Sequence, residues 1–217
     1  MAPALFPSLP ALRQLLLERF PPAIRGAGDA LATGIPALDA LTGGLPRPGL
    51  TELVCSAPSC GSQLFLGQVL QAMRVRALRA ALVDHGDGFD PCSWPDQALD
   101  HLVWVRARHA PEAMAAADLL ARDANLGLVV MDLRHTAPAE LRRIPAAHWY
   151  RLQRAVEPAT LACLILTPQA CVPGTSLRLE LPSSHPLAAC NDPRPRLTAT
   201  LPLVLVKQRT AAFAATG

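Results

Sequence analysis

Short apolar runs alternate with helix-forming stretches along most of this chain of 217 residues. The runs have the length of buried β-strands, and they lie at 50–55, 80–84, 102–106, 127–132 and 161–167. Apolar residues at helical spacing fill intervals between them, at 63–78, 111–123 and 147–156. Strands that alternate with helices are typical of βαβ units. We therefore expect an α/β fold with a mainly parallel central sheet flanked by helices.

The pattern changes after Gln169. Residues 176–181 and 197–207 alternate between apolar and polar positions, as half-buried strands do. A proline-rich connection at 182–195 joins these two stretches. The alternation predicts an antiparallel pair of strands at the C-terminal edge of the sheet.

A separate helix is predicted near the N-terminus, over residues 9–20. It ends before Pro21 and Pro22, because proline cannot continue a helix. We accordingly divide the chain into an N-terminal helix and linker, 1–29, and a core domain, 30–217. Four apolar side chains form one face of the helix: Leu12, Leu15, Leu16 and Phe20. That face packs either on the core of the chain itself or on a partner protein.

The net charge is small, at +3, and Lys207 is the only lysine. Nucleic-acid binding by charge alone requires a strongly basic face, so only weak or partner-assisted DNA contact stays open. The cysteines at 55, 60, 92, 163, 171 and 190 form no CxxC pair and lack histidines at zinc-ligand spacing. We therefore expect no metal site. No apolar run has the length of a membrane span and no secretory signal is visible, so a cytoplasmic protein without a membrane partner is expected.

The most specific pattern lies in the window 32–53. The residues that carry it are Thr33, Gly34, Leu38, Asp39, Gly43, Gly44, Leu45, Pro46, Gly49 and Glu52. This window resembles the start of the RecA core, where the family carries a "TG…LD…LGGGLP.G…E" pattern just before its phosphate-binding loop. The resemblance implies a RecA-like core, and it continues more weakly to about residue 212.

Three downstream features extend the resemblance. Residues 84–91 fall where RecA proteins carry "DAEHALDP" after the second core strand. Asp132 closes an apolar strand, as the Walker B aspartate does. Gln169 follows the strand at 161–167, at the place of the glutamine that senses the γ-phosphate.

The phosphate-binding loop itself departs from the family pattern. A working loop needs a first glycine, a lysine on the β- and γ-phosphates, and a Ser or Thr hydroxyl on Mg²⁺. In this register the first glycine is Ser56 and the second is Gly61. The lysine position holds Ser62, and the Mg²⁺-ligand position holds Gln63. Pro58 also stiffens the loop and removes one N–H donor.

Other parts of the hydrolytic machinery are missing as well. Lys207 lies far from the loop in sequence, so no shifted register restores the loop lysine, and Gly86 replaces the glutamate that would activate water. We expect no catalysis and no bound cofactor, with Ser56, Gly61, Ser62, Gln63, Asp132 and Gln169 as a vestigial nucleotide site. Structural alternatives stay open: Asp132 capping a turn, Gln169 satisfying buried backbone, and the aspartates of 84–91 standing in a solvated loop.

The C-terminal segment 206–213 is similar to "VKNKIAAPF", which contacts ATP across a subunit boundary in RecA filaments. The resemblance implies that Lys207 and Arg209 lie at an interface, together with the apolar face of the helix at 9–20.

Arginines follow the strand that ends at Asp132. Arg134, Arg142 and Arg143 lie in the interval where RecA carries a DNA-contacting loop, and arginine grips phosphates. We note them as weak DNA candidates. Trp149 and Leu152, at helical spacing, indicate a packing face instead.

A short RecA-like chain with an N-terminal helix and a decayed loop resembles the ImuA family. These bacterial proteins accompany a Y-family polymerase-like protein, ImuB, and an error-prone polymerase in SOS mutagenesis cassettes. The resemblance implies a non-catalytic accessory factor in translesion synthesis that binds these partners or the RecA recombinase. The alternatives are a divergent ATPase that binds nucleotide and single-stranded DNA, and a cell-division inhibitor similar to SulA.

Overall fold

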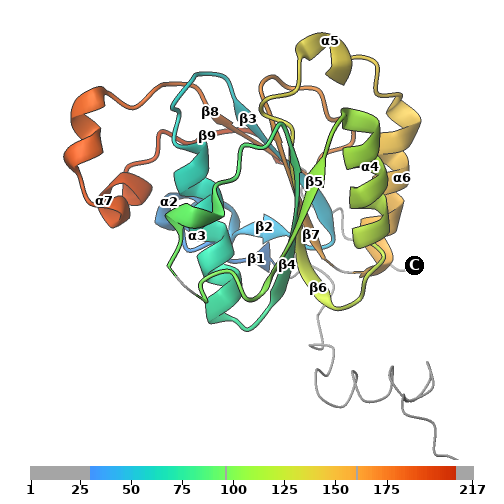
Figure 1. Cartoon of the computed structure of the whole chain (residues 1–217), viewed down its shortest axis with the longest axis horizontal. Helices are drawn as coiled ribbons and strands as arrows, with labels where there is room; N and C mark the ends of the chain where they lie inside the picture. Colours follow the sequence, from blue (N-terminus) through green and yellow to red (C-terminus); the bar gives the residue numbers. More distant parts are fainter. Residues whose placement is uncertain (1–29, 96, 160, 209–217) are drawn as a thin grey trace, which may run out of the picture.

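A central sheet of seven strands organises the molecule (Figure 1). The computed structural model describes residues 30–208 except 96 and 160. The strand order is β5-β4-β6-β7-β3-β8-β9, with β9 antiparallel to β8 and every other pair parallel. The strands are β3 Gly49–Cys55, β4 Arg79–His85, β5 Leu102–Ala107, β6 Leu126–Asp132, β7 Ala162–Thr167, β8 Leu177–Leu181 and β9 Val204–Gln208. The predicted α/β class and the antiparallel C-terminal pair are confirmed.

Helices cover both faces of the sheet. Helix α3 (Ser62–Val75) lies on one face, with α2 (Pro36–Thr42) nearby, whereas α4 (Ala110–Leu120) and α6 (Ala146–Ala159) lie on the other (Figure 1). The short helix α5 (Pro138–Leu141) precedes α6.

Each face of the sheet has its own apolar core, because successive strand residues point to opposite faces. In β4, Leu82 belongs to the α3 side and Val83 to the α4–α6 side. Trp149 and Leu152 are buried in the second core, so the predicted packing face of α6 is confirmed.

The residues of the sequence window 32–53 hold the chain in place ahead of the sheet. Asp39 of α2 accepts hydrogen bonds from the Thr33 hydroxyl at 2.7 Å and from the Thr33 and Gly34 N–H groups at 2.8 Å each. Gly44 packs on a short strand, β1 (Ala30–Leu31), which pairs with β2 (Leu45–Pro46). A Cβ at Gly44 would lie 2.2 Å from the Leu31 carbonyl oxygen, so no larger residue fits there. These window residues therefore have a structural role: they hold α2 and the β1–β2 pair in place.

Glu52 ties three parts of the sheet together from the middle of β3. Its fully buried carboxylate accepts hydrogen bonds from Arg178 Nε of β8 at 2.6 Å and from Thr167 Oγ1 of β7 at 3.1 Å. The backbone N–H groups of Cys171 and Val172 donate to it at 2.7 and 3.1 Å. A buried carboxylate needs such partners, because its charge has left water.

The prediction of a continuous strand over 197–207 is wrong in its first half. Residues Arg194–Ala199 form helix α7, and Leu187–Asn191 form a 3₁₀ turn, η2, within the proline-rich connection. Pro193 and Pro195 lie at the start of α7, where proline is tolerated and its fixed φ favours a helical turn. The strand resumes only after Pro202, as β9, and its five residues are all exposed.

Other boundaries shift by at most three residues from the predicted ones. The predicted helix at 9–20 lies outside the described residues, and so does the whole N-terminal unit 1–29. None of the helices in the described part of the chain is long and apolar enough to cross a bilayer.

Replacing Glu52 by alanine tests whether this buried carboxylate holds the sheet together. We expect Glu52→Ala to lower the free energy of unfolding by about 3–5 kcal/mol, because Arg178 and two N–H groups lose their partner in the interior. The control Glu157→Ala, on the exposed side of α6, should change it by less than about 0.5 kcal/mol. Urea denaturation of both variants measures the difference, and equal stabilities would contradict the assignment.

Candidate functional site

The carboxyl ends of the parallel strands meet at one edge of the sheet. At this edge β3 enters the loop 56–61, which leads into α3, and β6 ends at Asp132. Only β7 separates β3 from β6. Ligands of open α/β sheets bind outside these strand ends, so this edge is the candidate site.

The loop keeps a tight turn without being a phosphate-binding loop in composition. Ser59 and Gly61 have left-handed backbones, with φ of 52° and 88°, and Gly61 caps α3. A Cβ at Gly61 would lie 2.6 Å from Leu201 Cδ2 and 2.7 Å from His185 Nε2. The Ser56 hydroxyl donates to Glu180 Oε1 of β8 at 2.5 Å. Ser56 and Gly61, the residues at the two glycine positions of the resembled motif, are thus each held by contacts within the chain.

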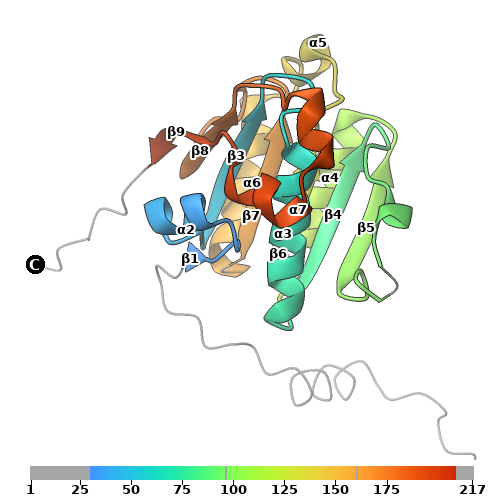
Figure 2. The same cartoon turned by 90° about the vertical axis from the view of Figure 1, so that its left-hand side faces the viewer.

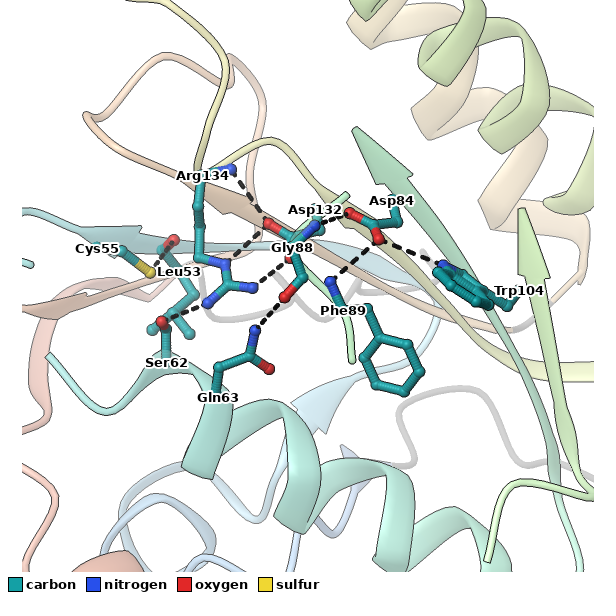
Figure 3. Close-up of polar contacts among 10 residues, drawn as sticks. All are labelled: Leu53, Cys55, Ser62, Gln63, Asp84, Gly88, Phe89, Trp104, Asp132 and Arg134. Carbon is teal, nitrogen blue, oxygen red and sulfur yellow. Dashed lines mark hydrogen bonds and ion pairs between the residues drawn. The ribbon is translucent and has the colours of Figure 1, made fainter. Parts of the chain in front are cut away.

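Arg134 joins the end of β6 to the start of α3 (Figure 3). Its Nε donates to Asp132 Oδ1 at 2.8 Å, and its Nη2 pairs with Asp132 Oδ2. Its Nη1 donates to Ser62 Oγ at 2.6 Å, and its backbone N–H donates to Asp132 Oδ1 at 3.1 Å. One guanidinium therefore contacts both Asp132 and Ser62, which the sequence resemblance places at the Walker B and lysine positions.

This ion pair is withdrawn from solvent. The Asp132 side chain is fully buried and that of Arg134 is 8% exposed. Burial lowers the pKa of the Arg134 guanidinium, hydrogen bonding and charge attraction to Asp132 raise it, and the net shift is upward. Arg134 thus stays charged and balances the Asp132 carboxylate inside the molecule.

Gln63 and Asp84 organise the next loop of the site. The Gln63 amide donates to the Gly88 carbonyl at 2.7 Å. Asp84, which is buried at the end of β4, accepts from the Gly88 and Phe89 N–H groups at 3.0 and 3.1 Å and from Trp104 Nε1 at 3.3 Å. The side chain at the Mg²⁺-ligand position thus serves a loop contact here (Figure 3).

The aspartates of the segment 84–91 have three separate roles. Asp84 is buried and not in a solvated loop. Asp87 pairs with Arg106 at 2.7 Å, and Asp90 caps a 3₁₀ turn, η1 (Pro91–Ser93). Among the described residues, no group of three or more His, Cys, Asp or Glu side chains is arranged to hold a metal ion.

Residues 182–203, which we call the covering segment, fold over the loop. Ser184 Oγ donates to the Pro58 carbonyl at 2.6 Å, and the His185 N–H donates to the Ser59 carbonyl at 3.0 Å. Helix α7 of this segment packs against α3, and it lies in front of α3 in Figure 2. A cavity of about 620 Å³ remains between the loop and this segment, lined also by Arg134, His135 and Pro168.

The remaining predicted residues are spread over the surface. Gln169 is half-buried beside the cavity-lining Pro168. Arg142 and Arg143 are exposed, whereas the third DNA candidate, Arg134, points inward. Lys207 is exposed on β9. The predicted interface residues Leu12, Leu15, Leu16, Phe20 and Arg209 lie outside the described residues.

Sequence reasoning missed the role of Arg134 and the position of the covering segment. A signal for the first was present: a cation two residues after a strand-end carboxylate reaches that carboxylate when the chain turns. The covering segment had no comparable signal, since its contacts to the loop use backbone carbonyls and a glycine.

No protein-family model matches this chain, and no curated protein matches it. The α/β fold with its mostly parallel sheet is therefore established by the structure alone.

A double-mutant cycle measures the Asp132–Arg134 pair. We expect Arg134→Met to lower the free energy of unfolding by about 3–5 kcal/mol, because it leaves a buried carboxylate unpaired. Adding Asp132→Asn should restore much of that loss, so the double variant is more stable than the sum of the single changes predicts. The control Arg142→Met removes an exposed arginine and should cost less than about 0.5 kcal/mol. Additive single changes, measured by denaturation, would contradict the pairing.

Proposed function

We propose that this chain is a RecA-like protein whose nucleotide site has become structural. In this proposal it works as a non-catalytic accessory factor in DNA-damage tolerance, of the ImuA kind, and it acts by binding other proteins. The partners are the Y-family polymerase-like ImuB, an error-prone polymerase or the RecA recombinase.

The main support for a non-catalytic role is that Arg134 donates hydrogen bonds to both Asp132 and Ser62. In a working site the Walker B carboxylate holds Mg²⁺ with a loop hydroxyl, and a lysine neutralises the phosphates. Here Asp132 is already neutralised by a buried cation. Mg²⁺ would have to displace Arg134, which breaks its bonds to Asp132 and Ser62, or lie beside it, which places positive charges together in the interior.

The covering segment supports the same conclusion. It contacts the carbonyls of Pro58 and Ser59, and its Leu201 side chain packs on Gly61. The loop is thus held by contacts with the protein's own chain. A core kept intact around such a loop fits a binding role better than a motor role.

The setting in DNA-damage tolerance rests on the sequence resemblance of the window 32–53 and on the decayed loop. The window residues Asp39, Gly44 and Glu52 have structural roles here, so they support kinship of fold. The choice of partners follows from the resemblance alone.

Isothermal titration with Mg·ATP tests the loss of nucleotide binding. We expect no Mg²⁺-dependent heat up to millimolar ATP, with or without single-stranded DNA, because Arg134 holds the groups that Mg²⁺ requires. Saturable binding that needs Mg²⁺ and is abolished by Asp132→Asn, but not by the control Asp87→Asn, would overturn the proposal in favour of the divergent ATPase.

Co-elution of the full chain with each purified partner tests the partner half. We expect a stable complex with the polymerase-like protein, the error-prone polymerase or the recombinase, formed equally with and without ATP. Ser62→Ala, which removes the hydroxyl that Arg134 contacts at the start of α3, should leave that complex unchanged. Absence of a complex with all three, or a complex that forms only with ATP, would refute it.

A further inference from the structure

Two cysteines flank the loop at the candidate site. Cys55 ends β3, and Cys60 precedes the capping residue Gly61 of α3. Both line the cavity beneath the covering segment, where Cys55 is half-buried and Cys60 is 1% exposed. Neither is in a disulfide.

The Cys55 Sγ donates to the Leu53 carbonyl oxygen at 3.7 Å. The two thiol groups also lie close enough to influence each other, since each shifts the pKa of the other. The N–H and hydroxyl of Ser62 lower the pKa of Cys60 as well. Cys60 lies at the N-terminal end of the 14-residue helix α3, where the unpaired N–H groups favour a negative charge. Ser62 and the end of α3 thus both stabilise a thiolate at Cys60.

The pKa values divide the pair into an attacking and a resolving thiol. The Cys55 side chain lowers the pKa of Cys60, burial opposes it, and the Ser62 N–H and hydroxyl lower it further, to about 6. The Cys60 side chain and burial both raise the pKa of Cys55. Near neutral pH, Cys60 is therefore the thiolate and Cys55 stays a thiol.

Two other cysteines provide a contrast within the same molecule. Burial raises the pKa of Cys163 in β7 to about 12. Burial and the nearby Glu52 carboxylate raise the pKa of Cys171 to about 12. These thiols have no thiolate character and are expected to be inert.

We propose that Cys55 and Cys60 form a reactive dithiol that hydroperoxides oxidise to a disulfide across the loop. This site goes beyond the proposed accessory function and does not depend on it. The class of reactant is a small hydroperoxide, such as hydrogen peroxide, which the cavity admits.

The reaction balances in two steps. The Cys60 thiolate attacks one peroxide oxygen, the O–O bond breaks, and a sulfenic acid forms as the departing hydroxide takes a proton to give water. The Cys55 sulfur then attacks the Cys60 sulfur. The S–S bond forms, the S–O bond breaks, and the leaving hydroxide takes the Cys55 proton as a second water. Two thiols and one peroxide thus become one disulfide and two waters.

Differential alkylation of the reduced full chain, before and after hydrogen peroxide, tests the proposal. Trypsin should place Cys55 and Cys60 in one peptide, 26–74, because the Arg47–Pro48 bond resists cleavage, and should place Cys163 and Cys171 in another, 155–178. We expect peptide 26–74 to lose both alkylation sites and two hydrogen atoms in mass. Peptide 155–178, the matched control, should keep both sites. If peptide 26–74 keeps both sites, or loses them no faster than the control peptide, the proposal is wrong.

Single variants assign the two roles. In Cys55→Ser, dimedone should trap a sulfenic acid on Cys60. In Cys60→Ser, Cys55 should resist the same treatment. In Cys55→Ser, the alkylation rate of Cys60 should not depend on pH near pH 8. The rate should fall as the pH is lowered, because protonation removes the thiolate. Stable over-oxidation of Cys60 in the wild type without a bridge to Cys55 would overturn the dithiol.

Discussion

The buried ion pair between Asp132 and Arg134 determines what this site can do. Asp132 is fully buried at the end of β6, in the middle of the sheet, where an unpaired carboxylate would be strongly destabilising. Arg134, two residues later, supplies the opposite charge. It also donates a hydrogen bond to Ser62 at the start of α3. The same contact therefore closes the strand end, anchors the loop and occupies the groups that a metal ion would need.

The surrounding structure is consistent with a site maintained for shape. The covering segment donates hydrogen bonds to loop carbonyls, Gln63 serves a loop contact, and Glu180 receives the hydroxyl that replaces the first glycine. Each interaction uses a residue at which the loop departs from a nucleotide-binding pattern, or a backbone group beside it. Under the proposed function, a loop held by such internal contacts forms part of a platform for protein partners. Cys55 and Cys60 line the cavity beside this loop, and Ser62, which follows the loop, accepts a hydrogen bond from Arg134.

The alternation of apolar runs was enough to predict the sheet, because strand and helix periods are local properties of the chain. It failed over 197–207, where prolines begin a short helix whose spacing also suits a strand. The loop departures at Ser56, Ser62 and Gln63 were readable because a motif defines those positions. The compensating cation left a local signal, because Arg134 follows Asp132 by two residues, but its contact with Ser62, 72 positions away, left none. The contacts of the covering segment were hidden for the same reason: they link residues distant in sequence through backbone groups.

Proton–nitrogen NMR of the arginine side chains tests the central claim most directly. The account predicts a slowly exchanging Nε–H resonance that is absent in Arg134→Met. This resonance remains unshifted when Mg·ATP is added in excess, because Asp132 stays bonded to Arg134. A saturable shift or loss of that resonance with Mg·ATP, but not with ATP alone, would show that the metal displaces the guanidinium and would contradict the account.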